Sequence, residues 1–202
     1  MLNYIAAPTW IENEQQLDAY YDEIGYISTD NYYSAYKQMA KWSRLAELRE
    51  LKGDSNKLAF SPTVINAFFY SRYNKIVLTS GILHPPFYNP SAPVVMNFGG
   101  IGTVIGHEIT HGFDDQGSQY DETGRWANWW RNDTRENYEE RVKCFELQYS
   151  RQVEPVTGKK VNGTLTIGDN IADNGGIKQA FKAYKIYTAT KEQAMDLKLP
   201  KS

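Results

Sequence analysis

The sequence predicts a mainly α-helical fold with one small β-sheet. Apolar side chains recur at helical spacing in four stretches, residues 30–51, 103–114, 133–150 and 169–187. Only two short runs are rich in β-branched and aromatic residues, at 64–70 and 75–79. The sequence therefore supplies one hairpin for a sheet and several helices to pack around it.

The composition is that of a globular chain of 202 residues without a strong charge bias, for which one domain is the default. Hydrophobic residues make up 41% and charged residues 23%, which excludes wholesale disorder. The formal net charge of −2 provides no basic field for phosphates, so neither nucleic acid nor an anionic membrane surface is an expected partner. The longest stretch without Asp, Glu, Lys or Arg, residues 76–107, contains four prolines and is not a membrane span.

The first half of the chain is expected to provide scaffold and an edge strand. Its helix is predicted to begin with Asp30 as the N-cap and to end before Gly53. Residues 71–74 have the length of a hairpin loop, so the two β-rich runs are expected to pair with each other. The proline-rich residues 83–93 are expected to be irregular, because proline removes backbone hydrogen-bond donors.

The helix predicted at 103–114 carries candidate metal-ligating and general-base residues. His107 and His111 are four residues apart, so both imidazoles lie on one face and can reach a single Zn²⁺. Glu108, next to that face, can accept a proton from water whose pKa zinc has lowered to about 7. The alternative is a surface helix with two chance histidines, because so short a pattern also occurs by accident.

The last two predicted helices differ in the residues that mark them. The helix at 133–150 is predicted to have Asp133 as its N-cap, with Glu136 three residues on, and to be structural. The final helix contains the pair Gly175 and Gly176, each of which costs about 1 kcal/mol in a helix interior relative to alanine.

An acidic pair at the start of the final helix could complete a metal site. A catalytic zinc takes three protein ligands, and Asp169 can supply the third. Asp173, one turn later, can hold the far ring nitrogen of a zinc histidine. The alternative for this pair is a solvated helix start, since acidic residues favour the first turn.

Five motifs, in order along the chain, resemble the neprilysin and endothelin-converting-enzyme family of zinc endopeptidases. They are residues 65–69, 80–87, 102–115, 129–130 and 168–176. The resemblance covers most of the chain from about residue 60, and residues 6–21 are similar more loosely. It implies a thermolysin-like zinc metallopeptidase catalytic subdomain, truncated at both ends. Residues 1–60 would be a helical scaffold, 61–120 the edge-strand hairpin and zinc helix, and 121–202 the third-ligand helix region.

The resemblance also implies roles for individual residues. It makes His107, His111 and Asp169 the ligands of one Zn²⁺ per chain. Glu108 becomes the general base and Asp173 the residue that orients a histidine. Asn66 and Ala67 would lie on an edge strand that pairs with an extended oligopeptide substrate.

The chain departs from the family pattern at two points. The third ligand is normally glutamate, and aspartate reaches about 1.5 Å less far, which predicts weaker zinc binding through Asp169. The family also carries a histidine that stabilises the oxyanion and an arginine that grips substrate, both beyond the region that this chain resembles. No histidine follows His111 and no arginine follows Arg151. Loss of an oxyanion donor typically costs about 100–1000-fold in rate, so activity of the fragment is expected to be weak.

The family is extracellular and usually anchored by an N-terminal membrane segment, so the resemblance implies a cell-surface or extracellular ectodomain. This chain itself shows no targeting segment. Two sequons make Asn132 and Asn162 candidates for glycosylation. The single cysteine, Cys144, would pair with a cysteine outside this chain; the alternative is a lone buried cysteine in the 133–150 helix.

The function that these observations predict is zinc-dependent endopeptidase activity of the neprilysin type on oligopeptides. The alternative is a catalytically silent module that binds zinc or peptide without turnover. A third alternative, a structural piece without metal, requires every motif to be a relic.

Overall fold

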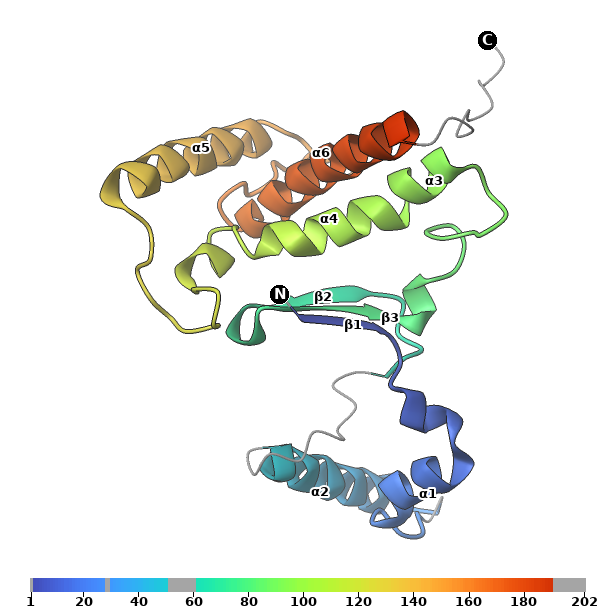
Figure 1. Cartoon of the computed structure of the whole chain (residues 1–202). Coiled ribbons are helices and arrows are strands. Elements are labelled where there is room, and N and C mark those ends of the chain that lie inside the picture. Colours follow the sequence, from blue (N-terminus) through green and yellow to red (C-terminus); the bar gives the residue numbers. More distant parts are fainter. Residues whose placement is uncertain (1, 28–29, 51–60, 191–202) are drawn as a thin grey trace. The chain divides into compact units, whose positions relative to one another are not determined.

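The computed structural model describes residues 2–27, 30–50 and 61–190 (Figure 1). Contacts along the chain divide it into two compact units, one formed by Ala7–Pro62 and the other by Met1–Ala6 with Thr63–Ser202. In the described part, no helix is both long and apolar enough to cross a membrane. The predicted class, mainly helical with a small sheet, is confirmed.

The smaller unit contains a 3₁₀ turn and two helices, α1 (Glu14–Asp22) and α2 (Tyr32–Glu50). The prediction that Asp30 caps the second helix is wrong by one residue. The side chain of Asn31 accepts the backbone N–H of Ser34 at 3.1 Å, which is the bond that an N-cap makes. The predicted stop at Gly53 lies outside the described residues.

The larger unit contains a three-stranded sheet in the order β1-β3-β2, formed by β1 (Leu2–Ala6), β2 (Ala67–Tyr70) and β3 (Lys75–Thr79). The predicted hairpin is confirmed, since β2 and β3 are antiparallel with Ala67 opposite Leu78. It is shorter than expected, because β2 begins at residue 67 and not at 64. β1 was not predicted, and it pairs with β3 in parallel. β3 is therefore the central strand, and β2 lies at an edge.

Within the described residues, this unit also contains four α-helices: α3 (Val94–Gly99), α4 (Ile101–His111), α5 (Asn132–Ser150) and α6 (Ile167–Thr190). α3 was not predicted, because it is short and directly follows the proline-rich segment, which is irregular as expected. α4 begins and ends earlier than the predicted 103–114.

The predicted cap of α5 is also wrong. Arg131 occupies the cap position, and no side chain caps the helix there. Asp133 already lies inside the first turn, where its carboxylate accepts the backbone N–H of Thr134 at 2.8 Å. Four residues at helical spacing on α5 are half-buried; these are Tyr138, Val142, Phe145 and Tyr149.

α4 and α6 pack against each other at unusually short range, with α4 between α6 and the sheet (Figure 1). A Cβ atom on Gly106 would lie 2.8 Å from the carbonyl oxygen of Gly176, and a Cβ on Gly176 would lie 2.8 Å from the backbone nitrogen of His107. Only glycine permits this approach, since real Cβ atoms do not come so close to backbone. α6 runs through Gly175 and Gly176 without a break.

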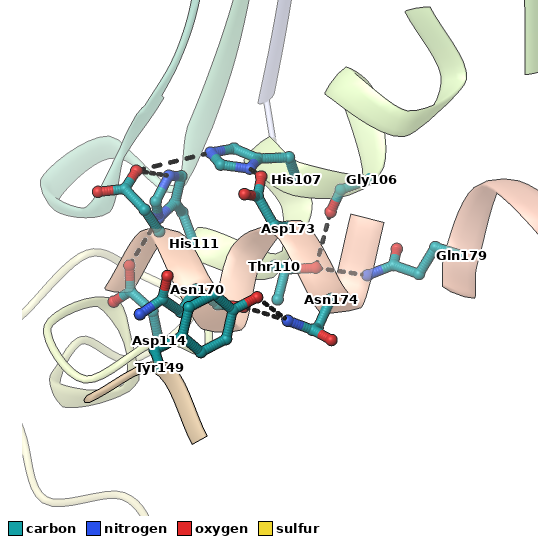
Figure 2. Close-up of polar contacts among 11 residues, drawn as sticks. Gly106, His107, Thr110, His111, Asp114, Tyr149, Asn170, Asp173, Asn174 and Gln179 are labelled. Carbon is teal, nitrogen blue, oxygen red and sulfur yellow. Dashed lines mark hydrogen bonds and ion pairs between the residues drawn. The ribbon is translucent and has the colours of Figure 1, made fainter. Parts of the chain in front are cut away.

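A buried hydrogen-bond chain joins the same two helices. The hydroxyl of Thr110 donates to the carbonyl of Gly106 at 2.7 Å and accepts from the side-chain amide of Gln179 at 2.7 Å (Figure 2). On the other side of α4, a core cluster connects the helix to the hairpin; it comprises Ala67, Leu78, Ile82 and Ile101. α4 is thereby fixed between the edge strand and α6, the two elements that line the site described next.

Candidate active site

Three predicted ligands converge at the crossing of α4 and α6. His107 and His111 lie one turn apart on α4, and Asp169 lies in the first turn of α6. The Asp169 Oδ1 atom is 4.0 Å from Nε2 of His107 and 3.9 Å from Nε2 of His111. All three ligand atoms lie within 4.8 Å of one another.

This donor set fits a tetrahedral divalent metal. Ligand atoms about 2.1 Å from a tetrahedral centre are separated by about 3.4 Å. The separations from Asp169 to the two imidazoles, 4.0 and 3.9 Å, therefore need only a small contraction. The glycine contact between α4 and α6 permits the close approach of the two helix backbones near this site.

Each imidazole contacts a carboxylate through its Nδ1 atom (Figure 2). Nδ1 of His107 lies 2.8 Å from Oδ1 of Asp173, the residue that the sequence placed beside a histidine. Nδ1 of His111 lies 2.6 Å from Oδ2 of Asp114, which sequence reasoning missed. A carboxylate at Nδ1 favours the tautomer with the proton on that nitrogen, and this leaves the Nε2 lone pair available to a metal.

Asp114 also shapes the turn that ends α4. Its Oδ1 accepts the backbone N–H groups of Gln116 at 2.9 Å and Gly117 at 2.6 Å. The residue is only 6% exposed, so its charge is compensated almost entirely by these bonds and by His111. Its spacing of three residues from His111 could have indicated a contact with that histidine. The turn that points the Asp114 side chain toward His111 could not be predicted from the sequence.

The environment shifts the pKa values of two site residues. Burial raises the pKa of Glu108, and the positive charges of His111 and His107 oppose that effect. Burial lowers the pKa of His111, but the hydrogen bond and charge of Asp114, with the charges of Glu108 and Asp169, outweigh it and leave the pKa raised. Glu108 is only 5% exposed, and its raised pKa suits a group that takes up and releases a proton.

These groups line one cleft of about 470 Å³, bounded by α4, the start of α6 and the edge strand β2. Asn66 and Ala67, the residues predicted to bind substrate, line the same cleft as His107, Glu108 and Asp169. The side-chain oxygen of Asn66 accepts the N–H of Ala67 at 2.9 Å. The structure therefore brings the predicted metal, base and substrate residues together.

The other residues singled out in the sequence lie on the surface. Asn132, the first residue of α5, and Asn162 are both exposed. Cys144 is exposed on α5, so the alternative of a lone buried cysteine in this helix is wrong.

Comparison with known proteins decides the family. The model of peptidase family M13 matches residues 66–199, which include every residue of the cleft described above. The chain belongs to peptidase family M13. The resemblance to neprilysins and endothelin-converting enzymes is thereby confirmed.

Individual relatives of this M13 chain support the same family assignment. It is 42% identical over 99% of its length to Neprilysin-11 of Caenorhabditis elegans and 41% identical over 97% to human Membrane metallo-endopeptidase-like 1. It covers 24% and 25% of those proteins, so it spans about a quarter of their length. A Mycobacterium tuberculosis zinc metalloprotease solved with an inhibitor superposes with a TM-score of 0.72 and 31% identity, over 94% of this chain and 29% of that one.

Replacing Asp114 with asparagine is expected to weaken metal binding to this M13 site by about 10–100-fold, the usual effect of removing a carboxylate behind a metal-ligating histidine. Asparagine keeps the oxygen that accepts the N–H groups of Gln116 and Gly117, but its amide cannot accept the proton on Nδ1 of His111. Competition with a chromogenic zinc chelator measures the affinity.

Asp115→Asn is the matched control. Oδ1 of Asp115 is buried and makes no hydrogen bond within the described part of the chain, and burial raises the pKa of this carboxyl. Its replacement is expected to leave zinc affinity within about threefold. Equal losses in the two variants would show that Asp114 has no specific role at His111.

Proposed function

We propose that this chain carries the catalytic centre of a zinc-dependent endopeptidase of the neprilysin type, acting on oligopeptides. The observation that carries this proposal is the single cleft in which two histidines, a carboxylate, a buried glutamate and an edge strand meet. His107, His111 and Asp169 would hold one Zn²⁺ per chain. Membership of family M13 supports the same activity.

The proposed chemistry divides among the residues of the cleft. Zn²⁺, when bound, supplies Lewis-acid polarisation and lowers the pKa of water to about 7. Glu108 removes the proton from the attacking water and later delivers it to the leaving amine, a role that its raised pKa favours. Asp173 and Asp114 keep the Nδ1 protons of His107 and His111 in place, so that both Nε2 atoms remain ligands.

The edge strand would position the substrate. β2 lies at the edge of the sheet and borders the cleft from Asn66 onward. An extended peptide laid along such a strand gains main-chain hydrogen bonds whatever its sequence, and pockets for alternate side chains provide selectivity. Asn66 and Ala67 are proposed to make these contacts next to Glu108.

The proposed location is outside the cell, as an extracellular or cell-surface ectodomain. The exposure of Asn132 and Asn162 is compatible with glycosylation at both sequons. An exported protein also suits an exposed Cys144 that pairs with a cysteine outside this chain.

Hydrolysis of a quenched fluorescent octapeptide tests the proposed activity. We expect cleavage in the presence of zinc, its loss when 1,10-phenanthroline removes the metal, and its return when zinc is added back. Mass spectrometry of the products shows whether one internal bond is cut. Zinc-loaded protein that binds the peptide without cleaving it would establish the silent binding module instead, and cleavage that survives chelation would exclude the proposed centre.

A further inference from the structure

A second cavity, of about 380 Å³, lies next to the metal cleft. Aromatic side chains from three separate segments form much of its lining, which is predominantly apolar; they are Phe69, Phe113, Tyr120 and Trp129. Its volume is within the range of about 300–1000 Å³ that is usual for pockets binding organic groups. The metal site and the predicted chemistry do not use it.

The cavity is held by specific contacts. The ring of Phe69 reaches across Gly112, where a Cβ atom would lie 3.3 Å from the tip of that ring. The indole N–H of Trp129 donates to the carbonyl of Ser118 at 3.1 Å. The side-chain amide of Asn74, which also lines the cavity, donates to the carbonyl of Glu122 at 3.1 Å. These contacts thus fix lining residues that come from different parts of the larger unit.

This cavity adjoins the cleft of the proposed active site, because the two have lining residues in common. Phe69, Ser71 and Gly117 line both of them. Along β2, the metal cleft begins at Asn66, and the second cavity begins at Phe69, toward the end of the strand. A peptide extended along β2 would therefore pass from the reacting centre to this cavity, with side chains on one face repeating every 6–7 Å or so.

Two acidic side chains at this cavity restrict which peptide side chains can enter it. Asp121 and Glu122 both line the cavity, and the hydroxyl of Thr123 with nearby backbone N–H groups lowers the pKa of Asp121. Among the residues that the structure describes, no basic side chain lines this cavity. An acidic side chain would meet two carboxylates there, whereas an apolar one would meet four aromatic rings.

We infer that this cavity is a second substrate pocket, which receives a large apolar side chain of the oligopeptide away from the scissile bond and rejects acidic ones. The inference rests on the proposed function, because it takes the occupant to be a peptide lying along β2. Trp129 is a specificity-determining residue in this account, and it is 44% exposed and thus accessible to a ligand.

Peptide binding to zinc-loaded Glu108→Gln protein tests the pocket without turnover. The probes are alanine octapeptides with one phenylalanine moved along the sequence, and their binding is followed by fluorescence anisotropy. We expect at least one position at which phenylalanine lowers the Kd about tenfold, the usual effect of burying one aromatic side chain. Glutamate at that position is expected to raise the Kd above that of the alanine peptide.

Adding Trp129→Ala is expected to reduce the phenylalanine advantage at that one position to within about twofold. The carbonyl of Ser118 keeps a donor in this variant, because the indole N–H of Trp130 also reaches it at 2.7 Å. Phe181→Ala is the control, since Phe181 is 62% exposed on α6 and lines neither cavity. If Trp129→Ala fails to bind zinc, Phe113→Ala takes its place, because Phe113 also lines the cavity.

The outcomes separate this inference from the proposed activity. The pocket would be overturned if phenylalanine lowered the Kd at no position of the peptide. It would also be overturned if the lower Kd persisted in Trp129→Ala, or if that variant weakened binding equally at every position. Hydrolysis by protein with Glu108 intact is measured separately. Position-specific binding without hydrolysis would contradict only the proposed activity, and hydrolysis without a Trp129-dependent preference would contradict only the pocket.

Discussion

Glu108→Gln is expected to lower peptide hydrolysis by about 100–10,000-fold, the usual contribution of a general base. Glutamine has the same shape but cannot accept a proton from water. The side chain is 5% exposed and lines the metal cleft, so no other carboxylate on α4 is available to replace it. Zinc binding is expected to be unchanged, because the proposed ligands are His107, His111 and Asp169. Product formation by mass spectrometry and zinc content by atomic spectroscopy measure the two effects.

Glu140→Gln, on the exposed face of α5, is the control for this change. It removes the same charge away from the cleft and is expected to leave both rate and zinc content as they were. If Glu108→Gln retained more than a tenth of the activity, the assignment of the base would be wrong. A parallel loss of zinc would mean that the glutamate supports the metal site instead of the proton transfer.

Gly176→Ala is expected to destabilise the protein by about 1–3 kcal/mol, although alanine favours a helix by about 1 kcal/mol relative to glycine. The new methyl would lie 2.7 Å from the carbonyl oxygen of Thr103 and 2.8 Å from the nitrogen of His107, both of which are backbone atoms. α6 must therefore move away from α4. Asp169 would move with it, so zinc affinity is expected to fall together with the unfolding free energy. Urea denaturation and a zinc titration measure the two quantities.

The same substitution at Gly99, in α3, is the matched control. A Cβ atom there would meet nothing within 4 Å beyond its chain neighbours and its own helix backbone, and the residue is helical, so Gly99→Ala is expected to be neutral or stabilising. If Gly176→Ala were as stable as Gly99→Ala, close packing of α4 against α6 would not determine the geometry of the site.

The sequence predicted the site best where one segment carries the signal. His107, Glu108 and His111 belong to a single helix, so their spacing alone brought them to one face. Asp169 and Asp173 were found in the same way as a pair on α6. Asp114 was missed because its direction depends on how the chain turns after α4, where it accepts two backbone N–H groups.

Contacts between distant segments were not predictable from local patterns. Gly175 and Gly176 were expected only to weaken their helix, but Gly176 is what allows α6 to approach His107. β1 carries no alternation of apolar and polar residues, and its parallel partner β3 lies far along the chain. The second cavity likewise combines residues after β2, after α4 and before α5. Helix ends differed by one to three residues. At Asn31 the reason is that neighbouring side chains compete for the cap.

The zinc content of the purified chain tests whether His107, His111 and Asp169 form a metal site. Atomic spectroscopy is performed after dialysis without chelator, beside His107→Ala and the control His84→Ala. His84 is exposed and its ring contacts the carbonyl of Ser80, outside the metal cleft. We expect close to one zinc per chain in the native protein and in His84→Ala, and close to none in His107→Ala. A value near zero in the native protein, or one that survives His107→Ala, would contradict this metal site.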